Sequence, residues 1–589
     1  MTDVYMNGAT QSSPSIAYFS MEICLDQAIP TYSGGLGVLA GDTLRSAADL
    51  KLPMTGVTLL HRKGYFRQRL DQRGNQTEGP VEWRPEEILQ ELPERATVII
   101  EGRDVQVRAW RYAIRGVTGH EIPVLLLDTA LPENSEYDQT LTDSLYGGDS
   151  QYRLCQEVVL GIGGAQLLRA TGAGLADDAR FHMNEGHSAL LSVMLLEWQL
   201  EGRKPFELTE DDIEAVRRLC VFTTHTPVPA GHDRFPPDLV RRILGAERLQ
   251  LLEAAKVLDN GELNMTHLAL RLSRFVNGVA MKHREVSLAM FPGFPIDSIT
   301  NGVHAGTWTS PAFQALLDRR IPEWRTDNMY LRYAVGIPLS EIRAAHAEAR
   351  KDFFAEVARR SGVELDPNVF TMGFARRATP YKRADLMFTD VERLANIADK
   401  VGPVQIVFGG KAHPHDGGGK DLIRRIHDAA LRLEGRVTVV YLENYEMALA
   451  AKMVAGVDLW INNPMKPLEA SGTSGMKAAL NGVPSLSVLD GWWIEGHVEG
   501  VTGWSIGSAE SEGDQSMDAK DLYLKLERVI LPLFYGLPFA YAQVMRSAIA
   551  LNGSFFNTQR MVEQYVRNAY FPAESELGAP LSAEQAIRR

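Results

Sequence analysis

The chain has 589 residues, more than the roughly 250–300 at which a single hydrophobic core stops growing, so at least two lobes are expected. Hydrophobic residues make up 45% of the chain and charged residues 23%, a composition that excludes a disordered or fibrous protein. The formal net charge of -13, without any long Lys/Arg block, argues against nucleic acid or an anionic membrane as a partner.

The N-terminus and the cysteines predict a soluble cytoplasmic protein. No basic start precedes an apolar segment, and no stretch reaches the roughly 20 apolar residues that a membrane span needs. The odd number of cysteines indicates reduced thiols rather than disulfides. No metal is expected, because the spacing of four histidines in the first half suits no compact site. The cysteines are Cys24, Cys155 and Cys220, and the four histidines are His182, His187, His225 and His232.

The first half of the chain predicts an α/β lobe over residues 16–300, after a polar tail at 1–15. Short apolar runs such as IAYF, ATVIIEG, EIPVLLLD and LCVFTTH alternate with amphipathic stretches such as 154–170. Alternating buried strands and helices are typical of a mainly parallel sheet.

The second half predicts another lobe of the same kind. Residues 301–365 are expected to form a helical connector that contains one long helix over 338–362. Five apolar runs then follow from Val369, in the segments VFTMGFARR, PVQIVFGGK, RVTVVYLENY, VDLWINN and VPSLSVLD. These runs predict a lobe over 366–560, with a helical tail at 561–589. Ligands of open α/β sheets bind beyond the carboxyl ends of the strands.

The segment EASGTSGMKAAL, from Glu469 to Leu480, predicts an anion site at a helix start. Small residues and hydroxyls precede a run that favours a helix, whose first N–H groups are unpaired. Lys477 would lie in the first turn, where a lysine beside a phosphate cradle could form a Schiff base with pyridoxal phosphate. The alternative is a capped helix with a solvated lysine.

The segment ARRATPYKR, from Ala375 to Arg383, places four cations within eight residues at the end of a predicted strand. In an otherwise acidic protein, this clustering predicts an anion site, with a solvated basic loop as the alternative.

Both segments resemble motifs of the glycogen and starch phosphorylase family, the α-glucan phosphorylases. EASGTSGMK is similar to the family's EASGT-x-x-MK segment, and the resemblance implies that Lys477 carries pyridoxal 5'-phosphate as a Schiff base. ARRATPYKR is similar to the family's R-x-x-x-x-Y-K-R segment, which implies that Arg377 and Lys382 bind the substrate phosphate and take part in catalysis. The same resemblance places Arg376, Thr473, Ser474 and Tyr445, the last within LENY, beside the cofactor.

Further matches follow in the family's order. TYSGGLGVLAGD resembles the family's glycine-rich loop, which implies that Gly34 and Gly35 approach the substrate phosphate. FTTHTP and ITNGVHAGTW resemble the family's sugar-binding segments, with His225 also expected to assist catalysis. FGGKAHP and NEGHSAL also match, but we assign them no chemistry. The resemblance implies a sugar site built from Leu36, His225, Asn301, Tyr381, Glu469, Ser471 and Gly472.

The resemblance implies two Rossmann-like lobes facing a deep cleft, the GT-B glycosyltransferase architecture. The implied activity is reversible phosphorolysis of the non-reducing-end glucosyl unit of an α-1,4-glucan, giving glucose 1-phosphate from inorganic phosphate with retention of configuration. The family also implies a homodimer. Thr379, Val38 and the pair Ser474–Gly475 depart from the animal and plant enzymes and resemble a shorter microbial branch.

Three other functions are open. GLGVLA at 35–40 fits a dinucleotide fingerprint, but the strand before it and the acid after it are lacking. A nucleotide-sugar-dependent glucan synthase of the same fold would resemble K-x-G-G-L-G, whereas this chain has Thr31 in place of the lysine. A non-catalytic glucan-binding protein is disfavoured by the full set of phosphate, sugar and lysine positions.

Overall fold

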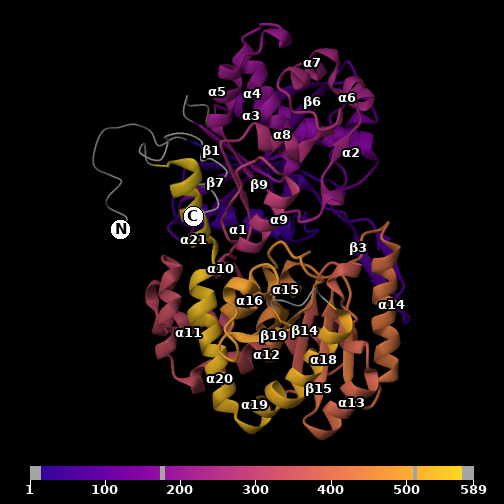
Figure 1. Cartoon of the computed structure of the whole chain (residues 1–589), viewed down its shortest axis with the longest axis vertical. Helices are drawn as coiled ribbons and strands as arrows, with labels where there is room; N and C mark the ends of the chain where they lie inside the picture. The colour runs from indigo at the N-terminus through magenta and orange to yellow at the C-terminus, as the bar shows by residue number, and fades with distance from the viewer. Residues whose placement is uncertain (1–14, 173–178, 509–513, 573–589) are drawn as a thin grey trace.

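The computed structural model describes residues 15–172, 179–508 and 514–572, which form an upper and a lower lobe (Figure 1). Apart from residue 15, the predicted N-terminal tail lies outside these ranges, as does the part of the predicted C-terminal tail from residue 573 onward. Within the described ranges, no helix combines the length and apolar character that a membrane crossing requires.

The upper lobe is built on a sheet of nine described strands, in the order β13-β12-β9-β8-β1-β2-β7-β6-β5. Strands from β13 to β7 run parallel, whereas β5 and β6 add an antiparallel edge. The strand bounds are β1 Ile16–Ser20, β2 Met54–Leu59, β5 Gln90–Ile100, β6 Arg103–Arg115, β7 Glu121–Asp128, β8 Arg180–Asn184, β9 Cys220–Thr223, β12 Phe275–Gly278 and β13 Asp297–Ser298.

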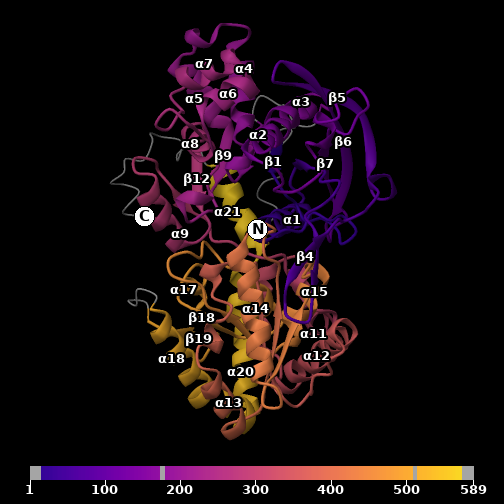
Figure 2. The same cartoon turned by 90° about the vertical axis from the view of Figure 1, so that its right-hand side faces the viewer.

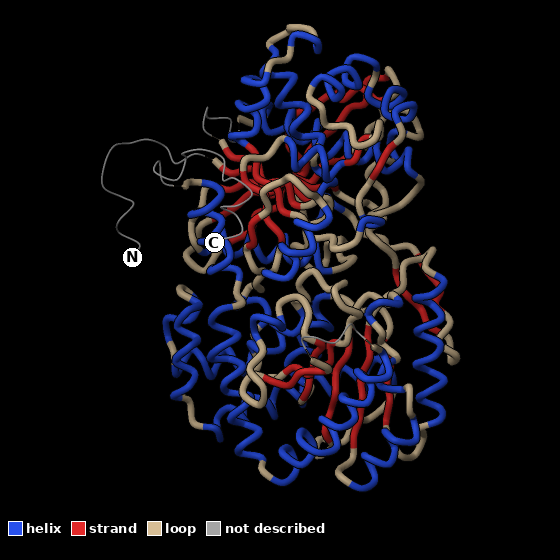
Figure 3. The backbone as a smooth tube through the Cα atoms, viewed as in Figure 1, coloured by secondary structure: helices blue, strands red, loops and turns tan. Residues whose placement is uncertain are grey.

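Helices cover both faces of this sheet because its central strands are buried and apolar on both sides (Figure 3). The predicted helix over 154–170 is divided, since a π-helical turn at Val159–Gly163 separates α2 from α3. The helix bounds are α1 Gly35–Asp49, α2 Ser150–Val158, α3 Gly164–Ala170, α4 Leu190–Leu200, α5 Glu210–Leu219, α6 Pro237–Leu244, α7 Ala246–Ala254, α8 Met265–Arg271 and α9 Met281–Met290.

The lower lobe contains an all-parallel sheet in the order β16-β15-β14-β17-β18-β19. The order reverses between β14 and β17, and a ligand crevice is expected at that point in doubly wound sheets. All five predicted strands are present, and β19 joins them at one edge. The bounds are β14 Phe370–Ala375, β15 Val404–Gly409, β16 Thr438–Leu442, β17 Leu459–Asn462, β18 Ser485–Val488 and β19 Gly503–Ile506.

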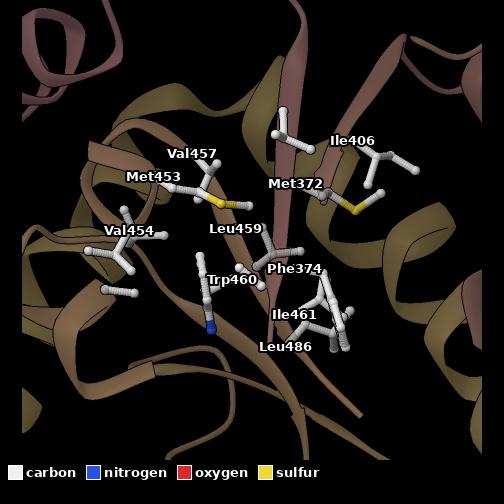
Figure 4. Packing of buried hydrophobic residues seen from close by; sticks show 14 of the residues in the cluster. Met372, Phe374, Ile406, Met453, Val454, Val457, Leu459, Trp460, Ile461 and Leu486 are labelled. Atoms are coloured by element: carbon white, nitrogen blue, oxygen red, sulfur yellow. The ribbon is translucent and has the colours of Figure 1, made fainter. Parts of the chain in front are cut away.

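Apolar strands and helices form the core of the lower lobe (Figure 4). Met372 of β14, Trp460 of β17 and Met453 of α15 are completely buried in it. The helix bounds are α10 Ala305–Trp308, α11 Pro311–Arg320, α12 Leu339–Ser361, α13 Val391–Lys400, α14 Gly417–Arg432, α15 Met447–Gly456, α16 Ser474–Leu480, α17 Trp493–Gly496, α18 Gln515–Lys525, α19 Leu531–Gly536, α20 Pro538–Ser547 and α21 Thr558–Tyr565.

The chain passes between the lobes more than once. Helix α12 is the predicted long helix; it follows Pro338 and ends at Ser361, before Gly362, which adopts the left-handed conformation of a C-cap. After α20, the chain returns to the upper lobe, where α21 packs beside α1 (Figure 1). The domain boundaries at 300, 365 and 560 stay a prediction.

Candidate active site

A cavity of about 540 Å³ lies between the lobes and is lined by segments that follow strands of both sheets. Every residue that the sequence predicts for the site lines it, although the first and the last of them are more than four hundred positions apart in the chain. They are Gly34, Gly35, Leu36, His225, Asn301, Arg376, Arg377, Tyr381, Lys382, Tyr445, Glu469, Ser471, Gly472, Thr473, Ser474 and Lys477.

The glycine-rich loop brings the start of α1 to the cavity. Gly34 precedes the helix in an extended conformation, and a Cβ at this position would lie only 3.1 Å from Nη2 of Arg377. The lack of a side chain therefore lets the backbone of the upper lobe approach a guanidinium of the lower lobe. The first N–H groups of α1 have no partner within the helix and are suited to an anion.

Two of three cations at the cavity share one carboxylate, and the third has none in the part of the chain that the structure describes. Arg376 forms an ion pair with Glu469, and Lys382 Nζ lies 2.7 Å from the same carboxylate. Although burial raises the pKa of Glu469, these two cations lower it to about 2. Arg377 donates to Ser33 Oγ at 3.2 Å and has no carboxylate in ion-pair contact among the described residues. Arg377 is therefore the cation of this group that is available to a bound anion.

Lys477 lies in α16 with 8% of its surface exposed. Its Nζ sits 3.7 Å from the centroid of the Trp308 ring, and among the described residues it has no hydrogen-bond acceptor. Burial lowers the pKa of Lys477 to about 8. A lysine with a lowered pKa has a larger neutral fraction, and the neutral amine is the nucleophile that attacks a carbonyl carbon.

The surroundings of Lys477 fit an aromatic aldehyde that carries a phosphate. Nε of Arg376 and Oγ of Ser471 are buried and have no hydrogen-bond partner within the described part of the chain. Tyr445 is 7% exposed and packs edge-on against Tyr32. An amine, unsatisfied donors and an aromatic wall thus surround one part of the cavity, and this donor set suits a phosphate ester better than a metal.

Two neutral polar side chains, those of His225 and Asn301, lie on the upper wall of the cavity. His225 Nε2 is 2.7 Å from Asn184 Oδ1, and the His225 backbone donates to Glu185 at 2.8 Å. Burial lowers the pKa of His225 to about 3, so the ring is uncharged near neutral pH. Oδ1 of Asn301 is buried and has no partner in the described ranges. Such uncharged donors and acceptors suit the hydroxyl groups of a sugar.

Several cavity residues were missed by sequence reasoning. The segment NEGHSAL supplies Glu185 and His187, and FGGKAHP supplies Lys411, although both motifs were quoted without a chemical role. Burial lowers the pKa of Lys411 to about 8, and its Nζ donates to Phe66 O at 2.8 Å. Glu22 is 1% exposed and accepts from Tyr146 at 2.8 Å; no local sequence signal identified it.

Comparisons with a family model and with known proteins all point to the same family. The carbohydrate phosphorylase family model matches residues 244–503. A maltodextrin phosphorylase of Thermococcus litoralis is 40% identical over 95% of this chain and 70% of its own length. Glycogen phosphorylases of Mycobacterium tuberculosis and Aquifex aeolicus are 38% and 35% identical, each over 96% of this chain and over 72% and 87% of their own lengths.

Proposed function

The chain belongs to the carbohydrate phosphorylase family, and from this premise we propose that it transfers the non-reducing-end glucosyl unit of an α-1,4-glucan to inorganic phosphate. The product is glucose 1-phosphate with retained configuration, which makes the enzyme a glycosyltransferase. One observation carries the proposal: the glycine-rich loop, Arg377 and Lys477 line a single cavity between two lobes.

We propose pyridoxal 5'-phosphate as the cofactor, bound covalently through Lys477. Arg376 and Ser471 offer unsatisfied donors for its phosphate, with Thr473 and Ser474 beside them, and Tyr445 forms an aromatic wall. When bound, the cofactor supplies a phosphate group that assists proton transfer to the departing glycosidic oxygen.

Both lobes contribute groups that bind the substrate phosphate in this proposal. Arg377 supplies positive charge from below, while the N–H groups at Gly34 and Gly35 approach from above. Lys382 is paired with Glu469 at 2.7 Å and lines the same cavity as Arg377, so its charge adds to the positive potential there. Cations and helix N–H groups offset the repulsion between two neighbouring phosphates, which would otherwise be strong in a buried site.

The remaining residues orient the sugar and exclude water. Asn301 offers an acceptor that no described residue occupies, and Leu36, His225, Tyr381, Glu469, Ser471 and Gly472 line the rest of the sugar site. Glu469 stays ionised because its pKa is near 2, so its carboxylate accepts hydrogen bonds from hydroxyls. Closure of the two lobes around the substrates would keep water from competing with phosphate for the reacting carbon.

A phosphate-dependent assay tests this proposal. Purified protein with a linear maltodextrin should release glucose 1-phosphate when inorganic phosphate is present and release none when it is absent. In the reverse direction, glucose 1-phosphate should extend the glucan while ADP-glucose should not. Chain extension from ADP-glucose alone would instead indicate a nucleotide-sugar-dependent synthase.

We also propose a cytoplasmic homodimer. Cys24, Cys155 and Cys220 are buried free thiols, which suits a reducing compartment. Cell fractionation and analytical ultracentrifugation test the two parts of this proposal separately.

A further inference from the structure

A β-hairpin of the upper lobe docks on the lower lobe. Strands β3 (Arg67–Leu70) and β4 (Gln76–Gly79) form a separate antiparallel sheet. The hairpin extends downward and lies beside α14 (Figures 1 and 2). It is therefore a direct link between the lobes at one side of the cavity.

Two buried glutamines form the centre of this contact. Gln68 is completely buried; it donates to Gly410 O at 3.0 Å and accepts from the Asn444 backbone N–H at 2.8 Å. Gln76 donates to Ala412 O at 2.9 Å and accepts from the Ala412 N–H at 3.0 Å. The two amides are joined by a hydrogen bond of 2.9 Å from Gln68 to Gln76. These amides thus bind the backbone of the lower lobe much as a neighbouring strand would.

The backbone that the glutamines hold is connected to the phosphate-binding segment. Arg376 N–H donates to Gly409 O at 3.1 Å, and Ala378 N–H donates to Lys411 O at 3.0 Å. At Gly410, φ is 137°, and a Cβ there would lie 1.8 Å from Arg376 O. Segments 409–412 and 376–378 are therefore packed in direct contact, so a shift of one displaces the other.

From this arrangement we propose that Gln68 and Gln76 are positioning residues that hold Arg377 in place for substrate phosphate. They act through the backbone of segment 409–412, which contacts segment 376–378 on both sides of Arg377. The inference rests on the proposed function, because it assigns Arg377 to phosphate.

Burial favours the glutamines over the nearby ion pairs as the source of this positioning. Arg69–Glu443 and Glu78–Lys420 also join the hairpin to the lower lobe, but their side chains are 25% to 58% exposed. Exposed ion pairs contribute little to stability, whereas a buried group that loses its partner carries a full desolvation cost. Loss of Gln76 would leave both the N–H and C=O of Ala412 without their partners.

The test compares Gln76→Met with Gln90→Met. Methionine has a similar length to glutamine but cannot form these hydrogen bonds, so the first variant removes the amide while filling its space. Gln90 is an exposed residue at the start of β5 and serves as the matched control. Steady-state kinetics give kcat and the separate KM values for phosphate and maltodextrin, and calorimetric titration with inorganic phosphate measures binding directly.

We expect Gln76→Met to raise the KM for phosphate and weaken phosphate binding by about tenfold, with the KM for maltodextrin within about twofold of wild type. The control should match wild type. In an Arg377→Ala background, the same change should have little further effect on phosphate, because residues that act through one another are not additive.

An unchanged KM for phosphate, an equal rise in both KM values, or full additivity with Arg377→Ala would overturn the inference. If Gln76→Met does not fold, as judged by circular dichroism, Gln68→Met provides the same test through Gly410 and Asn444. Wild type is measured first: if it releases no glucose 1-phosphate with phosphate, the proposed function fails, and the positioning inference is withdrawn with it.

Discussion

Replacement of Lys477 by methionine should stabilise the cofactor-free protein. Lys477 is buried against Trp308, and among the described residues no acceptor receives a hydrogen bond from its ammonium group. Burial lowers its pKa from 10.5 to about 8, because the charged form is poorly solvated in the folded protein. Methionine fills a similar space without the charge.

The expected gain in stability of Lys477→Met follows from the lowered pKa of Lys477. A decrease from 10.5 to about 8 corresponds to roughly 3 kcal/mol of lost stability when the lysine is protonated in both states. The contact with Trp308, at 3.7 Å, offsets about 1–2 kcal/mol of this. Between pH 8 and 10.5 the unfolded chain binds the proton more tightly than the folded chain, so wild-type stability rises with pH over this window.

Urea unfolding of cofactor-free wild type and Lys477→Met tests this reasoning. At pH 7 the variant should be more stable by about 1–2 kcal/mol, and the difference should decrease as the pH is raised from 8 to 10.5. A variant that is equally or less stable than wild type at pH 7 would refute the view that Lys477 is a destabilised, reactive amine. Leu480→Met, in the same helix, controls for a methionine at a buried site.

Three further predictions concern the proposed phosphate and sugar sites. Arg377→Ala should raise the KM for phosphate by roughly 100-fold with little change in the KM for maltodextrin, as steady-state kinetics would show. Glu469→Gln should cost roughly 3 kcal/mol in urea unfolding near pH 7, because Arg376 and Lys382 lose their buried carboxylate. The pKa of Glu469 is lowered from 4.5 to about 2, so its stabilising effect is fully present above pH 4.5 and should be lost as the pH falls toward 2. Gly34→Ala should raise the KM for phosphate several-fold, because its Cβ would lie 3.1 Å from Arg377. Gly417→Ala should not, because its Cβ would contact no described residue beyond its own neighbours within 4 Å.

The sequence predicted the lower lobe well because its strands are short apolar runs with clear ends. All five predicted strands occur there. The predicted long helix lies between Pro338 and Gly362, the two residues that mark its start and its end in the sequence. Strand β19 was not predicted, since GWSI is short and lies close to glycine-rich turns. In the upper lobe, the antiparallel edge was not predicted either, because β6 contains many charged residues.

Most residues of the site were predicted from short sequence motifs. Such motifs can be recognised only where their residues are contiguous in the chain. The segments that carry Lys477, Arg377 and Gly34 were each recognisable along the chain, and the structure places them in one cavity. Glu22 could not be found in this way, because it follows β1 and reaches the cavity only through the fold. Gln68 depends on contacts with residues more than 300 positions away, which one sequence does not reveal.

The central claim is that Lys477 holds a vitamin B6 phosphate inside the cavity between the lobes. Reduction of the freshly purified, active protein with borohydride, followed by peptide mass spectrometry, tests it most directly. We predict a pyridoxyl adduct on the peptide that contains Lys477. An active protein whose Lys477 peptide carries no such adduct would contradict the account.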